Sequence, residues 1–306
     1  MSATQFQFLP NTSPEKADIV ILPVPYESTV SYKTGTAAAP EAILRASGQL
    51  EYYEEDAAWS PLQHMNICVL DAFQTDNNES EATTHQRLHD IVNNLNQNNL
   101  LIALGGEHSI TPDLVSARIP KPGTIVQLDA HADLRPHYQG SIYNHACPMH
   151  RLREQGHDLI MIGIRSLFES EAERINTDEN ITAYMDRHLR SSNAWPPLLK
   201  HLESLEGDVW LTIDMDAFDP GLVPGVGTPQ PGGLSWHQAL DILESLIYNP
   251  RINFRGMDIV ELTPDANHVS EITAAKLIQK ALSFWGKSKG HDQRPKTGSQ
   301  SHVDYH

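Results

Sequence analysis

Acidic and histidine side chains gather in three short segments of this 306-residue chain. These segments are a G-G-E-H run, a D-x-H-x-D pattern and a D-x-D pattern, and their candidate metal ligands are His108, Asp129, His131, Asp133, Asp214 and Asp216. Four carboxylates brought together without a cation would repel one another and raise one another's pKa values. Two divalent cations would cancel those four charges. The oxygen-rich ligand set favours Mn2+, and Co2+, Ni2+ or Zn2+ could occupy the same site less selectively.

The signal lies in the combination of these patterns rather than in any single residue. An Asp that ends a strand is often only a helix N-cap or a turn residue, so neither Asp129 nor Asp214 alone indicates a metal site. Because side chains alternate along an extended backbone, Asp129, His131 and Asp133 can share one face. Three such patterns at the strand ends of one sheet together predict a metal site.

Eight apolar segments are expected to form the strands that position these residues. Several are nearly continuous in Val, Ile and Leu, which is typical of strands buried on both faces of a parallel sheet. The expected strands span residues 19–25, 66–73, 100–104, 124–130, 159–165, 181–185, 209–216 and 254–262.

Helices are expected between the strands. Apolar side chains recur at i, i+3, i+4 and i+7 in three segments: Leu88, Ile91, Val92 and Leu95; Ala239, Ile242, Leu243 and Leu246; and Ala274, Leu277, Ile278 and Ala281. Ser270 is the expected N-cap of the last helix, with Glu271 in its first turn. The pattern predicts an α/β fold, a single doubly wound domain with an approximately eight-stranded parallel sheet. Ligands bind such sheets at the carboxyl ends of the strands, where the candidate metal ligands lie.

The composition narrows the classes of protein. With 22 basic and 39 acidic residues the net charge is −17, which disfavours binding to nucleic acid or to an anionic membrane. Cys68 and Cys147 are too few for a disulfide framework, which indicates a reducing compartment. No apolar run approaches the roughly 18 to 20 residues of a membrane span, and residues 1–18 lack the pattern of a secretory signal. We therefore expect a cytoplasmic protein.

The last part of the chain is expected to be a disordered polar tail. Residues 286–306 contain one aliphatic residue, Val303, and cannot bury enough apolar surface to become ordered. A folded domain is therefore expected over residues 1–285.

The motifs together resemble the ureohydrolase family, which includes arginases and agmatinases, and in particular its agmatinase-like branch. The similar segments follow the family's order over about residues 19–285 and read VPYESTVSYKTGTAAAPEAILRAS (24–47), GGEHS (105–109), DAHADLR (129–135), YNHACPMHR (143–151), DMDAFDPGLVPGVGTPQPGGLS (214–235) and GMDIVELTP (256–264). The resemblance implies an arginase-like fold for the catalytic domain of residues 1–285. It also implies two Mn2+ ions per subunit and a homotrimer or homohexamer.

The resemblance assigns the ligands to two ions. One ion would be held by His108, Asp129, Asp133 and Asp214. The other would be held by His131, Asp129, Asp214 and Asp216. Asp129 and Asp214 would therefore bridge the two ions, and a water between them would lose a proton and become the nucleophile.

Further residues are implied to act on the substrate. Glu261 would bind the guanidinium group through paired hydrogen bonds. Asp133 would take up a proton and pass it on, and His145 would carry a proton to the departing amine. Asn144, beside His145, is expected to contact the substrate.

Two positions depart from the pattern of many relatives, which carry Asp at the position of Glu107 and Ser at that of Asn144. We expect the first departure to change a hydrogen bond near the ligands and the second to affect substrate fit. Asp219 is expected to hydrogen-bond to a metal ligand.

The implied reaction is hydrolysis of a guanidinium group to urea and an amine. Agmatine is the expected small cationic substrate, with putrescine as the second product, because an amine tail suits a strongly acidic protein better than a carboxylate tail. N1-aminopropylagmatine is the main alternative, followed by guanidinobutyrate, free guanidine and arginine. Two other classes remain open at this point: a two-metal phosphoesterase and an inactive relative that acts as a binding protein.

Overall fold

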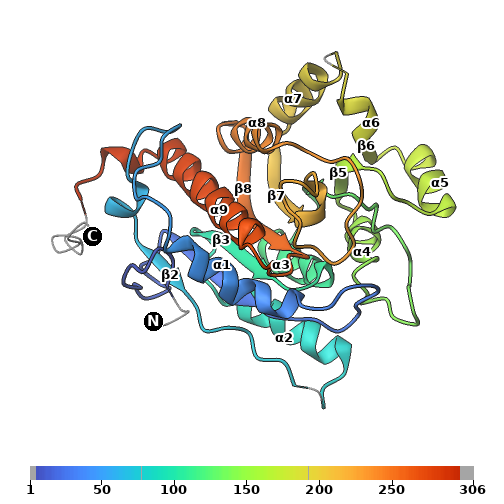
Figure 1. Ribbon diagram of the computed structural model, residues 1–306, viewed down its shortest axis with the longest axis horizontal. Helices are drawn as coiled ribbons and strands as arrows, with labels where there is room; N and C mark the ends of the chain where they lie inside the picture. The colour runs from blue at the N-terminus through green and yellow to red at the C-terminus, as the bar shows by residue number, and fades with distance from the viewer. Residues whose placement is uncertain (1–4, 77, 192, 297–306) are drawn as a thin grey trace.

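A single sheet of eight parallel strands organises the chain in the computed structural model, which describes residues 5–76, 78–191 and 193–296. The strands lie in the order β2-β1-β3-β8-β7-β4-β5-β6 (Figure 1). Their bounds are β1 (Ile19–Val24), β2 (Ile67–Val69), β3 (Leu100–Gly105), β4 (Thr124–Leu128), β5 (Asp158–Ile164), β6 (Ile181–Met185), β7 (Gly207–Asp214) and β8 (Ile252–Val260). All eight expected strands are present, and the predicted α/β fold of one doubly wound domain is confirmed.

Helices cover both faces of the sheet. On one face lie α1 (Ala39–Ser47), α7 (Trp195–Ser204), α8 (Trp236–Ile247) and α9 (Val269–Ser288). On the other lie α2 (Glu81–Asn93), α3 (Thr111–Arg118) and α4 (Pro148–Glu154). The short helices α5 (Glu169–Thr177) and α6 (Asp186–Leu189) flank the edge strand β6 (Figure 1). Successive strand residues alternate between two apolar cores; Ile125 packs with the α2 side, for example, and Val126 with the α9 side.

The apolar stripes of the helices are buried as their spacing predicts, with two exceptions in the stripe of α2. All four predicted stripe residues of α8 are buried, and Ser235 begins the helix with a capping box to Gln238. On α2, Leu88 and Val92 are buried, but Ile91 is 36% exposed. Leu95 lies beyond the helix end at Asn93 and is only partly buried. Successive residues turn by about 100°, so Ile91 lies at the rim of a buried face that Thr84 and His85 complete.

The start of α9 differs from the prediction that Ser270 is its N-cap. The helix begins at Val269, and its N-cap is His268 in the left-handed backbone region. The Asp265 carboxylate accepts the Ser270 amide hydrogen bond at 2.8 Å, so the amides of the first turn are satisfied from a preceding loop. The Ser270 hydroxyl is thereby free to accept from the Gly225 amide at 2.8 Å.

The sequence predicts a disordered tail from residue 286, and this start is too early. Helix α9 continues to Ser288, and a short 3-10 helix follows at His291–Gln293. The His291 ring is buried 5.4 Å from the Trp285 ring, and Arg294 Nη1 lies 2.8 Å from Asp18 Oδ1. These contacts order residues 286–296 despite their polar composition. The expectation for residues 297–306 lies outside the described residues.

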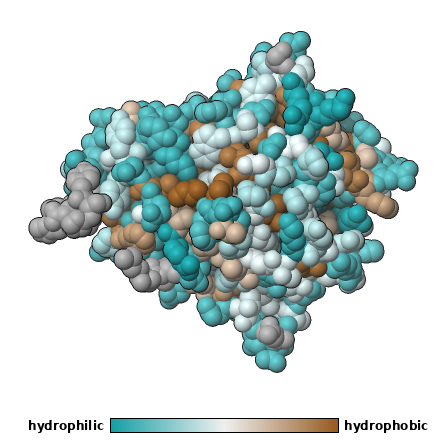
Figure 2. All heavy atoms as spheres, in the orientation of Figure 1, coloured by the Kyte–Doolittle hydropathy of each residue, from teal (hydrophilic) through white to brown (hydrophobic). Residues whose placement is uncertain are grey.

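Hydrophilic side chains cover most of the face shown in Figure 2, and apolar side chains lie between them in smaller groups. Within the described ranges, no helix has both the length and the apolar character needed to cross a membrane. Cys68 and Cys147 are both buried free thiols.

Candidate metal centre

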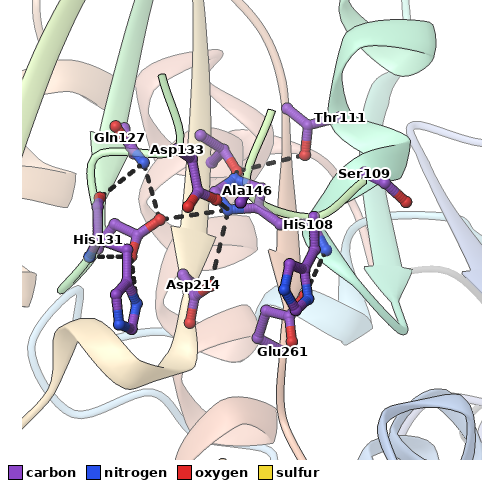
Figure 3. A network of polar contacts seen from close by, with 12 residues as sticks. His108, Ser109, Thr111, Gln127, His131, Asp133, Ala146, Asp214 and Glu261 are labelled. Carbon is purple, nitrogen blue, oxygen red and sulfur yellow. Dashed lines mark hydrogen bonds and ion pairs between the residues drawn. The ribbon is translucent and has the colours of Figure 1, made fainter. Parts of the chain in front are cut away.

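The candidate site lies at the carboxyl ends of the four central strands, β3, β8, β7 and β4. One row of paired residues runs across these strands near their ends, and it comprises Leu104, Ile259, Ile213 and Leu128. Because this register aligns the strand ends, the residues that follow converge (Figure 3). His108 follows β3, Glu261 follows β8, Asp214 is the last residue of β7, and Asp129 follows β4.

The first group of candidate ligands surrounds His108. Its Nδ1 atom lies 3.0 Å from Asp133 Oδ2, 3.2 Å from Asp129 Oδ2 and 3.6 Å from Asp214 Oδ2. All four side chains are buried. Their ligand atoms therefore face a common point, as a bound cation requires.

The second group surrounds His131, whose Nδ1 atom lies 2.9 Å from Asp216 Oδ2 and 3.7 Å from Asp129 Oδ1. Asp129 therefore faces both imidazoles, one with each carboxylate oxygen. Asp214 turns Oδ2 toward His108 and accepts the Asp216 amide hydrogen bond on Oδ1 at 2.8 Å. The structure thus brings all six predicted ligands together, in two groups that Asp129 joins.

The hydrogen bonds of His108 test whether these residues fit a metal ion. Its Nε2 atom lies 2.9 Å from the Thr212 hydroxyl, which in turn donates to Asp258 Oδ1 at 2.6 Å. Since the hydroxyl hydrogen is committed to Asp258, Nε2 donates to the hydroxyl oxygen and Nδ1 faces the carboxylates. Burial alone would lower the pKa of His108, but Asp129 and Asp133 raise it well above its ordinary value. Nδ1 is buried and has no hydrogen-bond partner among the described residues. A ring nitrogen among three carboxylate oxygens calls for a positive charge at this point, which a metal ion in place of a proton supplies, so the donor set fits a cation.

Electrostatic shifts support the same conclusion. Burial and the charges of Asp133 and Asp216 raise the pKa of Asp129 to about 7. Burial and the charges of Asp216 and Asp129 raise the pKa of Asp214 well above its ordinary value. Burial alone would lower the pKa of His131, but Asp216 and Asp129 raise it to about 10. Each shift reports a deficit of positive charge, which two divalent cations would supply.

Polar residues inside the strands support the ligands, and sequence reasoning did not single them out. Gln127 Nε2 donates to Asp129 Oδ2 at 2.7 Å, and Thr212 and Asp258 fix the His108 ring as described above. Asp258 is fully buried and also accepts from the Trp210 indole at 2.7 Å. These residues could have been found in the sequence, because each is a polar residue within an otherwise apolar strand. Gln127 and Thr212 each precede a strand-end ligand by two residues and so share its face.

A cavity of about 220 Å3 opens beside the ligands. Asp133, Asp214, His145 and Glu261 line it, as does the exposed Phe168. His145 Nδ1 lies 3.8 Å from Glu261 Oε1, which accepts the backbone N–H of His108 at 2.7 Å. Burial lowers the pKa of His145, whereas burial and Glu107 raise the pKa of Glu261 well above its ordinary value.

Asp133 and Glu261 both have left-handed backbone conformations, with φ angles of 51° and 61°. Non-glycine residues adopt this region at a cost of about 1–3 kcal/mol. At both positions the turn directs a carboxylate into the cavity instead of along the strand.

Asn144 and Asp219 are placed differently from the expectations, whereas Glu107 makes its hydrogen bonds beside the candidate ligand His108. Asn144 is 1% exposed, and its Oδ1 atom accepts the Ala146 amide hydrogen bond at 3.0 Å. It therefore bonds within its own loop and is not among the residues that line the cavity. The Glu107 carboxylate accepts from the Ser28 and Thr29 amides, both at 2.8 Å. Asp219 is exposed and accepts from the Gly221 amide at 2.8 Å, which does not support the expected bond to a metal ligand.

An all-parallel sheet with a cavity of buried carboxylates and imidazoles at its carboxyl edge defines a class of α/β enzyme with a candidate two-cation centre. Residues 17–283 match the model of the arginase family. The chain is 37% identical over 287 residues to the N(1)-aminopropylagmatine ureohydrolase of Synechocystis sp., with 91% of this chain and 92% of the relative covered. It is 34% identical to the agmatinase of Pyrococcus horikoshii, with 88% and 93% covered.

A solved structure supports the same assignment. The crystal structure of agmatine ureohydrolase of Thermoplasma volcanium superposes with a TM-score of 0.80 at 30% identity, covering 91% of this chain and 93% of the other. The chain belongs to the arginase family and is a hydrolase of that family. The resemblance that the motifs indicated is thereby confirmed.

Proposed function

We propose that this chain is a two-metal ureohydrolase that hydrolyses the guanidinium group of an amine-tailed guanidino compound, agmatine or N1-aminopropylagmatine, to urea and the corresponding amine. One observation carries the proposal: the six candidate metal ligands lie together beside the cavity that Glu261 and His145 line. Mn2+ is the ion that the oxygen-rich ligand set favours.

The substrate is proposed from the relatives and from charge. The Synechocystis relative carries the name of an aminopropylagmatine hydrolase and the Pyrococcus relative that of an agmatinase. These names support N1-aminopropylagmatine at least as strongly as agmatine, the substrate that the sequence favoured. Both substrates have cationic tails, which suit a chain of net charge −17.

Binding of the guanidinium group is assigned to Glu261. Its carboxylate is buried and already accepts one backbone hydrogen bond from His108. A planar guanidinium can donate paired, charge-assisted hydrogen bonds to such a carboxylate. The cation would also favour the ionised form of Glu261, whose pKa is raised in the cavity without substrate. Glu261 would therefore hold the guanidinium carbon beside the metal ligands.

When bound, a pair of divalent cations lowers the pKa of a coordinated water and stabilises negative charge that develops in the transition state. Asp133 lies on the cavity wall and accepts a proton there. His145, also on that wall, is kept neutral by burial, so its free ring nitrogen can first take up a proton and then pass it to the departing amine.

The test is a urea-release panel on protein loaded with Mn2+, using agmatine, N1-aminopropylagmatine, arginine, guanidinobutyrate and guanidine. We expect kcat/KM for one of the two amine-tailed compounds to exceed that for arginine by about tenfold or more, equivalent to roughly 1.4 kcal/mol in transition-state binding. Glu261→Gln should retain its metal and lose urea release. If metal-loaded protein released no urea from any of these compounds, the proposal would be contradicted. If it instead released phosphate from phosphoesters, the phosphoesterase alternative would replace the proposal.

A further inference from the structure

Tyr143, two residues before His145, contacts a cluster of side chains from three helices. We define the Tyr143 cluster as Tyr143 with His85 of α2, Asp113 of α3 and Arg151 of α4. The mechanism proposed above uses none of these residues. Helices α2 and α3 pack side by side on the sheet face opposite α9, and α4 follows the loop that carries His145 (Figure 1).

Asp113 joins the other two helices at the centre of the cluster. One carboxylate oxygen contacts His85 Nδ1, and the other accepts from Arg151 Nη2 at 2.9 Å. The side chains of His85 and Asp113 are 3% and 9% exposed. Arg151 also donates from Nη1 to the backbone oxygen of Ser109 at 3.1 Å, directly after the candidate ligand His108. Arg151 therefore has little freedom to move.

The two planar groups held by Asp113 both contact the ring of Tyr143. The His85 ring stacks on it, with centroids 4.6 Å apart and an angle of 25° between the planes. The Arg151 guanidinium carbon lies 4.7 Å from the ring centroid. Aromatic stacking and cation–π attraction thus fix the ring, and the contacts are made by its face.

The loop residues on either side of Tyr143 are held by hydrogen bonds to two other segments. Ser141 Oγ donates to Glu81 Oε2 at 2.6 Å, and Glu81 lies one helical turn before His85 on α2. The Tyr143 amide donates to Ser141 Oγ at 2.9 Å, and the His145 amide donates to Thr29 Oγ1 at 3.0 Å. The Tyr143 ring is thus the side-chain anchor between two polar attachments.

We propose that Tyr143 is a positioning residue that holds the His145 loop against α2 and so sets the direction of the His145 imidazole in the cavity. The catalytic part of this inference rests on the proposed function. Because the ring face makes the contacts, Tyr143→Phe should preserve them and Tyr143→Leu should remove the stacking.

The first measurement compares kcat, KM and metal content in these two variants. Misplacing a catalytic group by about 1 Å can cost on the order of 100-fold in rate, so we expect kcat to fall by about 10- to 100-fold in Tyr143→Leu. We expect metal content and KM near the wild-type values, and Tyr143→Phe within about twofold of wild type on the same scale. His89→Ala is the matched control, since His89 lies one turn beyond His85 and contacts Gln86 and Asp90 of its own helix. Equal kcat in Tyr143→Leu and wild type would overturn the proposal.

A double-mutant cycle with His145→Ala separates positioning from general stability. If Tyr143 acts through His145, adding Tyr143→Leu to His145→Ala should change kcat by less than about twofold, because coupled residues are non-additive. Losses that multiply in the double variant would show that Tyr143 acts by another route.

Hydrogen exchange of the amides at residues 141–147 tests the anchoring role without measuring activity, so its outcome does not depend on the proposed function. Faster exchange in Tyr143→Leu than in wild type and Tyr143→Phe supports the anchoring role, even if the wild type releases no urea and the proposed function fails. Unchanged exchange in Tyr143→Leu would overturn the anchoring role whatever the activity.

Discussion

At the scale of single residues, Asp129 has the most connected position in the candidate centre. Its two oxygens face His108 and His131, and its Oδ1 atom also accepts the His131 amide hydrogen bond at 2.6 Å. One carboxylate therefore links both ligand groups. Removing its charge should affect both sites, whereas removing Asp216 should affect the His131 group first.

Asp129→Asn should lower the content of bound Mn2+ and abolish urea release, because the amide keeps the shape of the carboxylate but not its charge. Loss of a residue that only hydrogen-bonds to a metal ligand lowers metal affinity by roughly 10- to 100-fold. Because Asp129 is itself a candidate ligand, we expect a larger fall in Asp129→Asn. Metal analysis of the purified protein and equilibrium titration provide the readout. Asp219→Asn is the control, since Asp219 is exposed and bonds to Gly221. Two Mn2+ per chain in Asp129→Asn would disprove the bridging assignment.

Thr212→Val tests the support of His108 without touching a ligand. The substitution is nearly isosteric, but it removes the hydroxyl that lies 2.9 Å from His108 Nε2 and leaves Asp258 with one donor fewer. Metal affinity should fall by about 10- to 100-fold. Titration of metal-free protein with Mn2+ measures this change, and Thr177→Val on the exposed surface of α5 is the control. An unaltered affinity would mean that the hydroxyl does not orient the ring.

At the scale of elements, the contact between α9 and the loop at residues 54–56 combines burial with charge. Lys280 is 1% exposed, and its amine contacts the carboxylates of Glu54, Glu55 and Asp56. The Glu54 side chain is fully buried, and it also accepts the Ala57 amide hydrogen bond at 2.7 Å. Although its three carboxylates resemble a cation site in composition, the Lys280 amine already occupies their centre.

Lys280→Met should destabilise the fold by about 3–5 kcal/mol, because it leaves the Glu54 charge buried without a partner. Denaturant unfolding provides the measurement. Lys276→Met, one turn earlier on α9, removes a more exposed pair with Glu55 and should cost less than about 1 kcal/mol. Similar losses in the two variants would show that burial of Glu54 does not govern this contact.

The pH dependence of the same contact has a definite sign. Burial alone would raise the pKa of Glu55, but hydrogen bonds from Lys276 and Lys280 lower it from 4.5 to about 2. A carboxyl whose pKa is lower in the folded state contributes stability above its unfolded pKa, and this contribution is lost as the pH falls. Stability should therefore decline between about pH 4.5 and 2. The loss of stability that is due to this contact should be smaller in Lys280→Met. If the free energy of unfolding of that variant fell with pH in the same way as in the wild type, the assignment would be contradicted.

At the scale of the whole molecule, the candidate centre links four strands that are distant in sequence. Bound ions would tie the ends of β3, β4 and β7 together and so stabilise the native state relative to the unfolded chain, where no such site exists. The thermal transition should therefore depend on free metal concentration.

Mn2+ at 100 times its dissociation constant should add about 2.7 kcal/mol per site to the free energy of unfolding. The melting temperature of metal-free protein should rise by several degrees on adding Mn2+ and fall again with a chelator, on the order of 2–4 °C per kcal/mol. Scanning calorimetry tests this, with Asp129→Asn as the comparison. An equal rise in that variant would place the stabilising ions elsewhere.

Local patterns in the sequence were sufficient for the strands and for the positions of the six candidate ligands. Apolar runs predict strands because both faces of a parallel sheet are buried, and alternation along the backbone predicts which polar residues share a face. The same reasoning could not place the start of α9, since the amides of its first turn bond to Asp265 in the preceding loop. Nor could it predict order in residues 286–296, which depends on contacts such as that of Arg294 with Asp18.

The sequence by itself determined that carboxylates and imidazoles follow the strands at spacings suited to metal ions. Only the tertiary structure decided that β8 and β7 lie between β3 and β4, which brings Glu261 and Asp214 between His108 and Asp129. It also decided that Asn144 is buried and bonds within its own loop, that Thr212 and Asp258 orient His108, and that Tyr143 contacts His85. The physical reason is the separation along the chain over which each interaction acts. Alternation and capping act between neighbours, whereas strand order and side-chain partners are set by packing between segments up to 276 residues apart.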